Sequence, residues 1–257
     1  MLPLEQCRIL RPYLLGDGHA RYRSAILFLV PYRVKSPSRS RNLSEYAVPR
    51  DYHAYMKMLF ERILPRMRAL CGDTLGFADH SPIDERDAAV RSGLGVIGKN
   101  GLLINERYGT YVFIGELITE ATPDTLGYRA ISEEQRTCLS CGACLRACAT
   151  GCLSDYEKPC LSAITQKKGE LTEEEGALVL RFGCAWGCDL CQSACPMNVG
   201  AEDTPIPFFK EERIERLSSD CVRKMDDEAF KKRAFAWRGR ETVLRNLLLL
   251  EENEDRK

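Results

Sequence analysis

The sequence lacks a long apolar segment and any mark of an export signal. Its longest apolar run, from Ala25 to Pro31, is far shorter than the roughly 20 residues that a helix needs to cross a bilayer. The stretch from Met1 to Leu10 contains Glu5 and has neither a long apolar core nor a small-residue cleavage site, so we read no signal peptide there. We therefore expect a cytoplasmic protein that does not insert into a membrane.

Net charge is also absent, because 37 lysines and arginines balance 37 aspartates and glutamates. A neutral chain is not expected to coat nucleic acid non-specifically, although a local basic patch can still attract an anionic partner. Two runs are basic enough for this, at residues 33–41 and 231–240. For any single charge run, however, solvated surface is the more common explanation.

Cysteine is the residue type that this sequence has in excess. There are 13 cysteines in 257 residues, and most of them lie between Cys138 and Cys195. Disulfide scaffolds are usually small and secreted, which does not fit a chain of this length without an export signal. Close and regular spacing indicates metal binding instead. Cys7, Cys71 and Cys221 stand apart from the others, and we expect them to be core thiols.

Two cysteine motifs follow each other in this segment. The first is Cys138-x2-Cys141-x2-Cys144-x3-Cys148, and the second is Cys184-x3-Cys188-x2-Cys191-x3-Cys195. In two-cluster ferredoxins, three closely spaced thiolates hold one cube and the fourth reaches the other cube. Zinc accepts CxxC pairs, but a triple followed by a fourth cysteine, occurring almost twice, favours iron–sulfur ligation by soft thiolates. The sequence therefore predicts two [4Fe–4S] clusters and electron transfer.

The second motif leaves the identity of one ligand open. Spacing favours Cys184, but three residues separate it from Cys188 where two are usual. Cys152 and Cys160 are further thiols in the same segment. Spacing alone does not choose among them.

Hydrophobic periodicity outlines strands and helices on either side of the cysteine segment. The predicted strands are 24–31, 75–78 and 110–118, and the predicted helices are 51–70, 82–93, 211–217, 226–234 and 241–250. Residues 33–49 read as a long loop, and residues 93–104 as a glycine-rich turn that leads into a strand. This mixture indicates an α+β fold, α/β-like in its first part, with a two-cluster ferredoxin-like domain and short C-terminal helices. We expect domains at 1–130, 131–200 and 201–257.

Four blocks of sequence resemble one known family. They are RDYHAY from Arg50, ADHSPIDERDAAVRSGLGVIGKNGLLI at 78–104, YVFIGELIT at 111–119 and GCDLCQSACPMN from Gly187. Each block alone is weak, but together they are specific. They resemble the epoxyqueuosine reductase family, cobalamin- and iron–sulfur-dependent enzymes of tRNA modification. The resemblance covers roughly residues 20 to 200, with a weaker echo at RGRETVLRNLLLL.

The resemblance implies a cobalamin-binding catalytic domain at 1–130. It places the family's proton-donating aspartate at Asp79, which stands at the end of a predicted strand. From the residues alone Asp79 would be interpreted as a helix cap, and His53 as a structural histidine. The residues that the resemblance places near cobalamin are Tyr46, Asp51, Tyr52, His53, Lys99 and Asn100.

The resemblance also implies the cluster ligands. One cluster would take Cys138, Cys141, Cys144 and Cys195, and the other would take Cys148, Cys160, Cys188 and Cys191. Under this assignment Cys184 is a spare thiol. Two positions depart from the family pattern, since Ala149 follows Cys148 where proline is usual and Val96 replaces tryptophan in GLGWIGKN.

The expected activity is the reduction of epoxyqueuosine to queuosine in tRNA, with electrons from a donor such as flavodoxin or ferredoxin. The sequence resembles a short form of the family, without the C-terminal helical-repeat extension that helps many members to hold tRNA. Two alternatives therefore remain. One is a corrinoid and iron–sulfur reductase of another substrate, and the other is a plain electron carrier with two [4Fe–4S] clusters.

Overall fold

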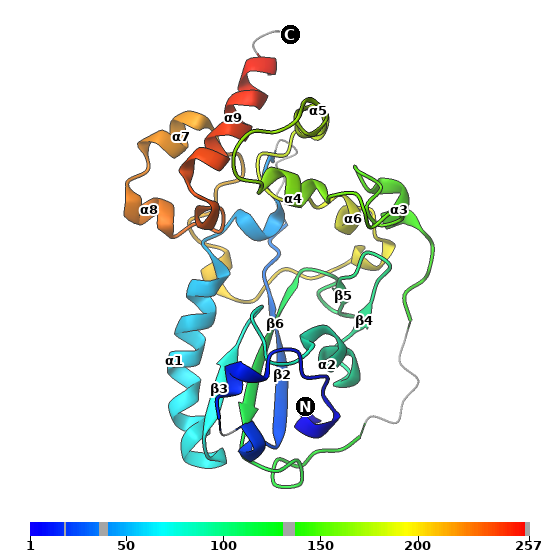
Figure 1. Ribbon diagram of the computed structural model, residues 1–257, viewed down its shortest axis with the longest axis vertical. Helices are drawn as coiled ribbons and strands as arrows, with labels where there is room; N and C mark the ends of the chain where they lie inside the picture. Colours follow the sequence, from blue (N-terminus) through cyan, green and yellow to red (C-terminus); the bar gives the residue numbers. More distant parts are fainter. Residues whose placement is uncertain (18, 36–40, 131–136, 255–257) are drawn as a thin grey trace. The chain divides into compact units, whose positions relative to one another are not determined.

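The computed structural model describes residues 1–17, 19–35, 41–130 and 137–254. These residues form two compact units (Figure 1). The sheet unit comprises residues 1–31, 53–140 and 200–202, and the helical unit comprises residues 32–52, 141–199 and 203–257. Each unit is made of several separate segments of the chain. The domains predicted at 1–130, 131–200 and 201–257 are instead continuous ranges based on sequence motifs. Those functional boundaries stay a prediction.

The sheet unit is built on an antiparallel sheet with the strand order β1-β2-β6-β3. Its strands are β1 Leu2–Pro3, β2 Ser24–Pro31, β6 Val112–Thr119 and β3 Thr74–Phe77. The two long strands pair over their whole length, from Ser24 opposite Thr119 to Pro31 opposite Val112. The predicted mixture of strands and helices is confirmed, and the antiparallel pairing is that of an α+β fold.

Side chains alternate between the two faces of a strand, and each face of this sheet receives a helix. On one face, Phe28 of β2 packs edge-on against Phe60 of α1 (Tyr52–Cys71), with ring centroids 6.3 Å apart. Glycine leaves room for these rings, since a Cβ at Gly76 would lie 2.6 Å from the Phe60 ring. The helix is held close to the sheet because the strands carry no side chain at that point.

The other face of the sheet carries the apolar core of the unit. Ala25 and Ile118 of the strands pack with Ala88 and Ala89 of α2 (Glu85–Arg91). A small hairpin, β4 (Val96–Ile97) with β5 (Leu103–Ile104), adjoins α2. Glu116 of β6 also belongs to this face and is fully buried, which makes it an exception among the apolar residues of the strand.

The helical unit contains the cysteine segment and the C-terminal residues. Its α-helices are α3 Ala143–Ala147, α4 Leu161–Thr165, α5 Glu173–Phe182, α6 Leu190–Ser193, α7 Ser219–Lys224, α8 Asp227–Lys231 and α9 Arg240–Glu254. The fully buried side chains of Trp186, Phe235 and Leu247 lie in its core. The helix predicted at 211–217 is wrong, because these residues form bends and Glu212 has a positive φ.

No helix within the described residues is both long enough and apolar enough to cross a membrane.

Candidate functional site

Two short helices of the cysteine segment each carry one of the predicted ligands. Cys144 lies in α3 and Cys191 in α6, and these two helices pack against each other. Positive φ angles at Ser140 and Gly142 curl the backbone of the first motif. Of the predicted ligands, only Cys138 is grouped with the sheet unit. The repeated motif thus produces a repeated local structure.

Each of the 13 cysteines, all of them in the described part of the chain, is a thiol rather than half of a disulfide. Among the described residues, no three His, Cys, Asp or Glu side chains are grouped as a single metal ion would require. The fit to [4Fe–4S] clusters therefore rests on the donors themselves, which are soft thiols at ferredoxin spacing.

Two thiols that the resemblance leaves as spares each contact a predicted ligand. The Sγ atoms of Cys148 and Cys152 lie 3.5 Å apart. Burial alone would raise the pKa of Cys148, but hydrogen bonds from the Leu153 backbone and from Cys152 lower it to about 7. A hydrogen bond from Cys184 likewise lowers the pKa of Cys188, and the same contact together with burial raises the pKa of Cys184. In each of these two pairs the predicted ligand, Cys148 or Cys188, has the lowered pKa. It therefore forms a thiolate more readily, and the thiolate is the form that binds iron.

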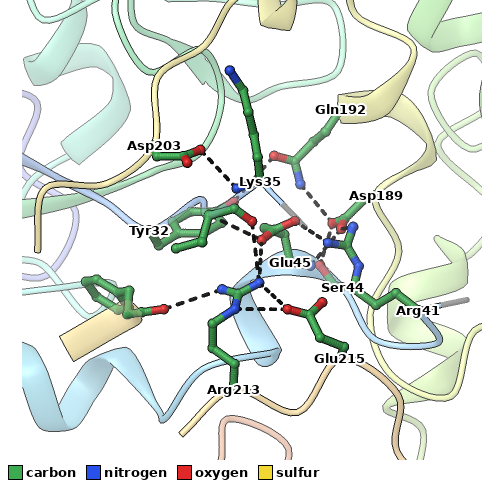
Figure 2. Close-up of polar contacts among 12 residues, drawn as sticks. Tyr32, Lys35, Arg41, Ser44, Glu45, Asp189, Gln192, Asp203, Arg213 and Glu215 are labelled. Carbon is green, nitrogen blue, oxygen red and sulfur yellow. Dashed lines mark hydrogen bonds and ion pairs between the residues drawn. The ribbon is translucent and has the colours of Figure 1, made fainter. Parts of the chain in front are cut away.

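The second cysteine motif is anchored by the side chain of Asp189, which was not singled out from the sequence. Figure 2 shows that Ser44 and Arg41 point toward this carboxylate. The Ser44 hydroxyl donates to Asp189 Oδ1 at 2.5 Å, and the Glu45 backbone N–H donates to Oδ2 at 2.7 Å. Gln192 Nε2 donates to Oδ1 at 3.1 Å. The loop between two predicted ligands is thereby fixed to residues 41–45.

Arginines neutralise the buried carboxylates of this network. Arg41 forms ion pairs with Glu45 and, at 3.3 Å, with Asp189. Arg213 lies 3.4 Å from Glu45 and 2.8 Å from Glu215, as Figure 2 also shows. Burial raises the pKa of Asp189, while the bonds from Ser44 and Glu45 and the charge of Arg41 oppose that rise. We call this set of residues the arginine network.

Three of the residues expected near cobalamin belong to the helical unit. The Tyr46 hydroxyl accepts a hydrogen bond of 3.0 Å from Nε1 of Trp186, which stands two residues before Cys188. The Asp51 backbone N–H bonds to the Lys232 carbonyl at 2.9 Å. Tyr52 is buried as the first residue of α1. Tyr46 is thus tied to the backbone that leads into the predicted cluster ligands.

Asp79 follows β3 in a strained turn. Its φ is 61°, a left-handed value that a residue with a Cβ seldom adopts. Its carboxylate Oδ2 lies 3.4 Å from Nε2 of His53 on α1, and both side chains are more than half exposed. The cap interpretation of Asp79 is wrong, because α2 is capped by Asp84, which accepts from the Asp87 N–H. The structure therefore brings two of the predicted residues together.

A groove of about 470 Å³ begins at His53 and runs along α1 to Arg68. Met56, Phe60 and Leu64 give it an apolar wall, and Ala78 closes one side directly before Asp79. The His53–Asp79 pair thus stands where a polar site meets an apolar surface.

Lys99 and Asn100 lie in the turn between β4 and β5. The Lys99 side chain is exposed. Asn100 Oδ1 accepts from the Leu102 N–H at 3.3 Å, whereas its Nδ2 is buried without a hydrogen-bond partner among the described residues. This turn therefore offers a cation and an amide donor, which suits an acceptor-rich ligand.

Two glutamates behind the Asp79 turn were missed from the sequence. Burial raises the pKa of Glu116 to about 8, although the Ser81 hydroxyl donates to its Oε2 at 2.6 Å. Burial and the charge of Asp79 raise the pKa of Glu85 to about 7. One signal was available, because a glutamate on the core face of the strand YVFIGELIT breaks its apolar alternation.

These features define the class of protein: an iron–sulfur protein with two clusters and an antiparallel α+β unit. A family model for a 4Fe-4S double cluster binding domain matches residues 137–198. The chain belongs to the epoxyqueuosine reductase family. It is 30% identical to an epoxyqueuosine reductase of Leadbetterella byssophila over 256 residues, which cover 95% of this chain and 81% of that protein.

Solved structures show the same likeness. An epoxyqueuosine reductase crystallised with an epoxyqueuosine-modified tRNA-Tyr stem loop has a TM-score of 0.75 and 26% identity, covering 95% of this chain and 67% of that one. A Bacillus subtilis epoxyqueuosine reductase, whose catalytic aspartate loop is swung out of the active site, has a TM-score of 0.73 and 26% identity, covering 93% and 66%. Of two further curated reductases, the chain spans 62% and 61% of the length.

Proposed function

We propose that this chain is a reductase that uses two [4Fe–4S] clusters and cobalamin to convert epoxyqueuosine to queuosine in tRNA. The observation that carries the proposal is the coincidence of the family match with an aspartate held in a strained turn at the edge of an apolar groove. The family match alone indicates the reaction. Asp79 adds a side chain that can donate a proton in that reaction.

The proposed reaction removes the epoxide oxygen as water and leaves an alkene, which needs two electrons and two protons. When bound, the clusters would supply the electrons and cobalamin would supply a reduced metal centre for the epoxide carbon. Asp79 would hold a proton at its carboxyl oxygen and deliver it to the epoxide oxygen as general acid. His53, 3.4 Å from the Asp79 carboxyl, would orient that group.

The residues assigned to the clusters fit them, because all eight are thiols and two of them have their thiolates stabilised. Cys138, Cys141, Cys144 and Cys195 are proposed for one cluster, and Cys148, Cys160, Cys188 and Cys191 for the other. For cobalamin, the support is the buried Asn100 Nδ2 that has no partner among the described residues. Amide-rich corrin side chains carry acceptors for such a donor. Tyr46, Asp51, Tyr52, His53 and Lys99 complete the proposed cobalamin contacts.

The proposed partners follow from the same family. One relative was crystallised with a modified tRNA stem loop, which supports tRNA as the substrate of this chain. The electron donor is proposed to be flavodoxin or ferredoxin, because the clusters need a reduced carrier to supply their electrons.

A reconstitution assay tests the proposal. Protein loaded anaerobically with iron, sulfide and cobalamin is given a flavodoxin reducing system and tRNA that carries epoxyqueuosine. Queuosine in the digested tRNA is then measured by mass spectrometry. Bound corrinoid without queuosine would favour another substrate, and clusters without bound corrinoid would favour a simple electron carrier. Asp79→Asn is the test variant, and Asp87→Asn, an exposed change on α2, is the matched control.

A further inference from the structure

A pair of acidic side chains lies beneath the turn that carries Asp79. Glu116 projects from β6 on the face that α2 covers, and Glu85 is the first residue of α2. The carboxyls are close enough that Glu85 perturbs Glu116 both as a charge and as a hydrogen-bonding group. Neither forms an ion pair with lysine or arginine among the described residues. One oxygen of each, Glu85 Oε2 and Glu116 Oε1, is buried without a partner in that part of the chain.

Both glutamates hold the Asp79 turn directly. The Glu85 carboxyl accepts a hydrogen bond from the Asp79 backbone N–H. Glu116 accepts from the Ser81 hydroxyl at 2.6 Å, and Ser81 Oγ accepts in turn from the Ile83 N–H at 3.0 Å. The turn is therefore fastened to a strand and to a helix through carboxyl groups. A left-handed residue such as Asp79 costs free energy unless its surroundings hold it in place.

Because Glu85 acts on the buried Glu116 both as a charge and as a hydrogen-bonding group, the two carboxyls cannot both ionise without repelling each other. One shared proton removes the repulsion and provides a donor for an oxygen that otherwise has none. A shared proton would therefore let the two acids face each other under the turn.

We propose that Glu85 and Glu116 form a proton-sharing latch that keeps the Asp79 turn closed and releases it when the pair loses its proton. The two glutamates are positioning residues, since they act through the turn. The consequence for catalysis rests on the proposed function, because it needs Asp79 to be the acid. A loop that leaves its site is physically reasonable for this fold, since a B. subtilis relative has its catalytic aspartate loop swung out.

The latch predicts a direction of pH dependence. Glu116 and Glu85 bind a proton more tightly in the closed turn than in an open, solvated one, because burial raises the pKa of each, to about 8 and about 7. Closing is therefore favoured at low pH and loses free energy as the pH rises toward about 8, above which the loss is complete. The titratable and charged groups that face the pair are Asp79, Asp84, Arg86 and Cys7. The charge of Arg86 and the hydrogen bond from the Asp79 backbone N–H oppose the rise in pKa of Glu85.

Amide hydrogen exchange of the full, cluster-loaded chain tests the latch without any assay of turnover. Exchange of the 78–85 backbone is followed between pH 5.5 and 9, corrected for the intrinsic rate and compared with β6. In the wild type, protection should fall by up to about tenfold per pH unit as far as pH 8 and then level off. Glu116→Gln keeps an acceptor for Ser81 but cannot titrate, so its protection should change much less with pH. Ser81→Ala should lose protection at every pH.

Asp87→Asn is the matched control, because it removes an exposed acid from the same helix and should keep the wild-type slope. Wild-type protection that does not vary with pH would overturn the latch. So would a Glu116→Gln variant that is folded by circular dichroism and retains the full slope. A pH-dependent turn in a protein that makes no queuosine would leave the latch intact and refute the proposed function. Queuosine formation by a protein whose turn does not respond to pH would support the proposed function and refute the latch.

Discussion

The two units each bury a cluster of carboxylates, and they neutralise it in opposite ways. In the helical unit, Asp189 and Glu45 are paired with Arg41 and Arg213. In the sheet unit, Glu85 and Glu116 have no such cation among the described residues, and burial raises the pKa of each, which favours the protonated form. An arginine stays charged at any physiological pH. The arginine network is therefore a fixed anchor, whereas the glutamate pair responds to pH.

The largest effect should come from breaking the anchor. Asp189→Ala removes one of the two carboxylates paired with Arg41, takes the acceptor away from the Ser44 hydroxyl and the Glu45 N–H, and frees the loop between Cys188 and Cys191. Removing one member of a buried pair costs about 3–5 kcal/mol, so we expect poor folding and loss of bound iron and sulfide. Iron and acid-labile sulfide per chain, with thermal unfolding, measure this. Asp220→Ala, which breaks an exposed pair with Lys224, is the control and should leave cluster content unchanged.

On the sheet side, the largest effect concerns the acid itself. Asp79→Asn keeps the size of the side chain and removes its proton, so turnover should fall by about 10²–10⁴-fold if Asp79 is the general acid. Cluster and corrinoid absorption should stay at the wild-type level, because no predicted ligand is changed. Single-turnover formation of queuosine measures the loss. Turnover within a few-fold of wild type would remove Asp79 from the chemistry.

The comparison is sharpened by measuring stability against pH. Because the pKa of Glu116 rises to about 8 in the folded chain, its contribution to stability is complete below its usual pKa and is lost as the pH rises to about 8. The slope can reach about 1.4 kcal/mol per pH unit. Urea unfolding of the wild type and of Glu116→Gln at pH 5.5, 7 and 8.5 measures it. Equal slopes in the two proteins would mean that Glu116 is not protonated in the fold.

The smallest effect should come from a local feature of the helical unit that involves neither acid cluster. Thr172 and Glu175 form a reciprocal capping box at the start of α5. Thr172→Ala should lower the free energy of unfolding by about 1 kcal/mol, and its cluster content should match the wild type. Denaturant unfolding and iron analysis measure both. A loss of clusters in this variant would show that cluster binding depends on the cap of α5 as well as on the arginine network.

Short sequence patterns predicted the elements whose residues carry a clear hydrophobic or cysteine spacing. The strand at 24–31 was predicted with the bounds it has, since its apolar β-branched run pairs along its whole length with β6. The paired cysteine motifs were recognised because cluster geometry constrains spacing. The helix expected at 211–217 failed, because its backbone serves tertiary contacts: the Ile214 N–H bonds to the Val48 carbonyl.

The acid clusters could not be derived from pattern in the same way. Glu116 meets Ser81 and Glu85 only through the packing of β6 against α2, and Asp189 meets Ser44 across 145 positions of the sequence. The residues next to an Asp or Glu in the sequence do not indicate which distant side chain it will contact in the fold. Asp79 was found by resemblance, and its left-handed backbone has no signature in the residues around it, where glycine would be the usual choice.

The pairing of residues 41–45 with the second cysteine motif has a consequence for how the protein is made. A ribosome releases Ser44 long before it has synthesised Asp189, and the Asn42 side chain waits longer still for the Leu217 backbone to which it bonds. Contacts so far apart in sequence form slowly. The contacts that hold residues 41–45 to Asp189 and to Leu217 can therefore form only after residues 189 and 217 have been synthesised.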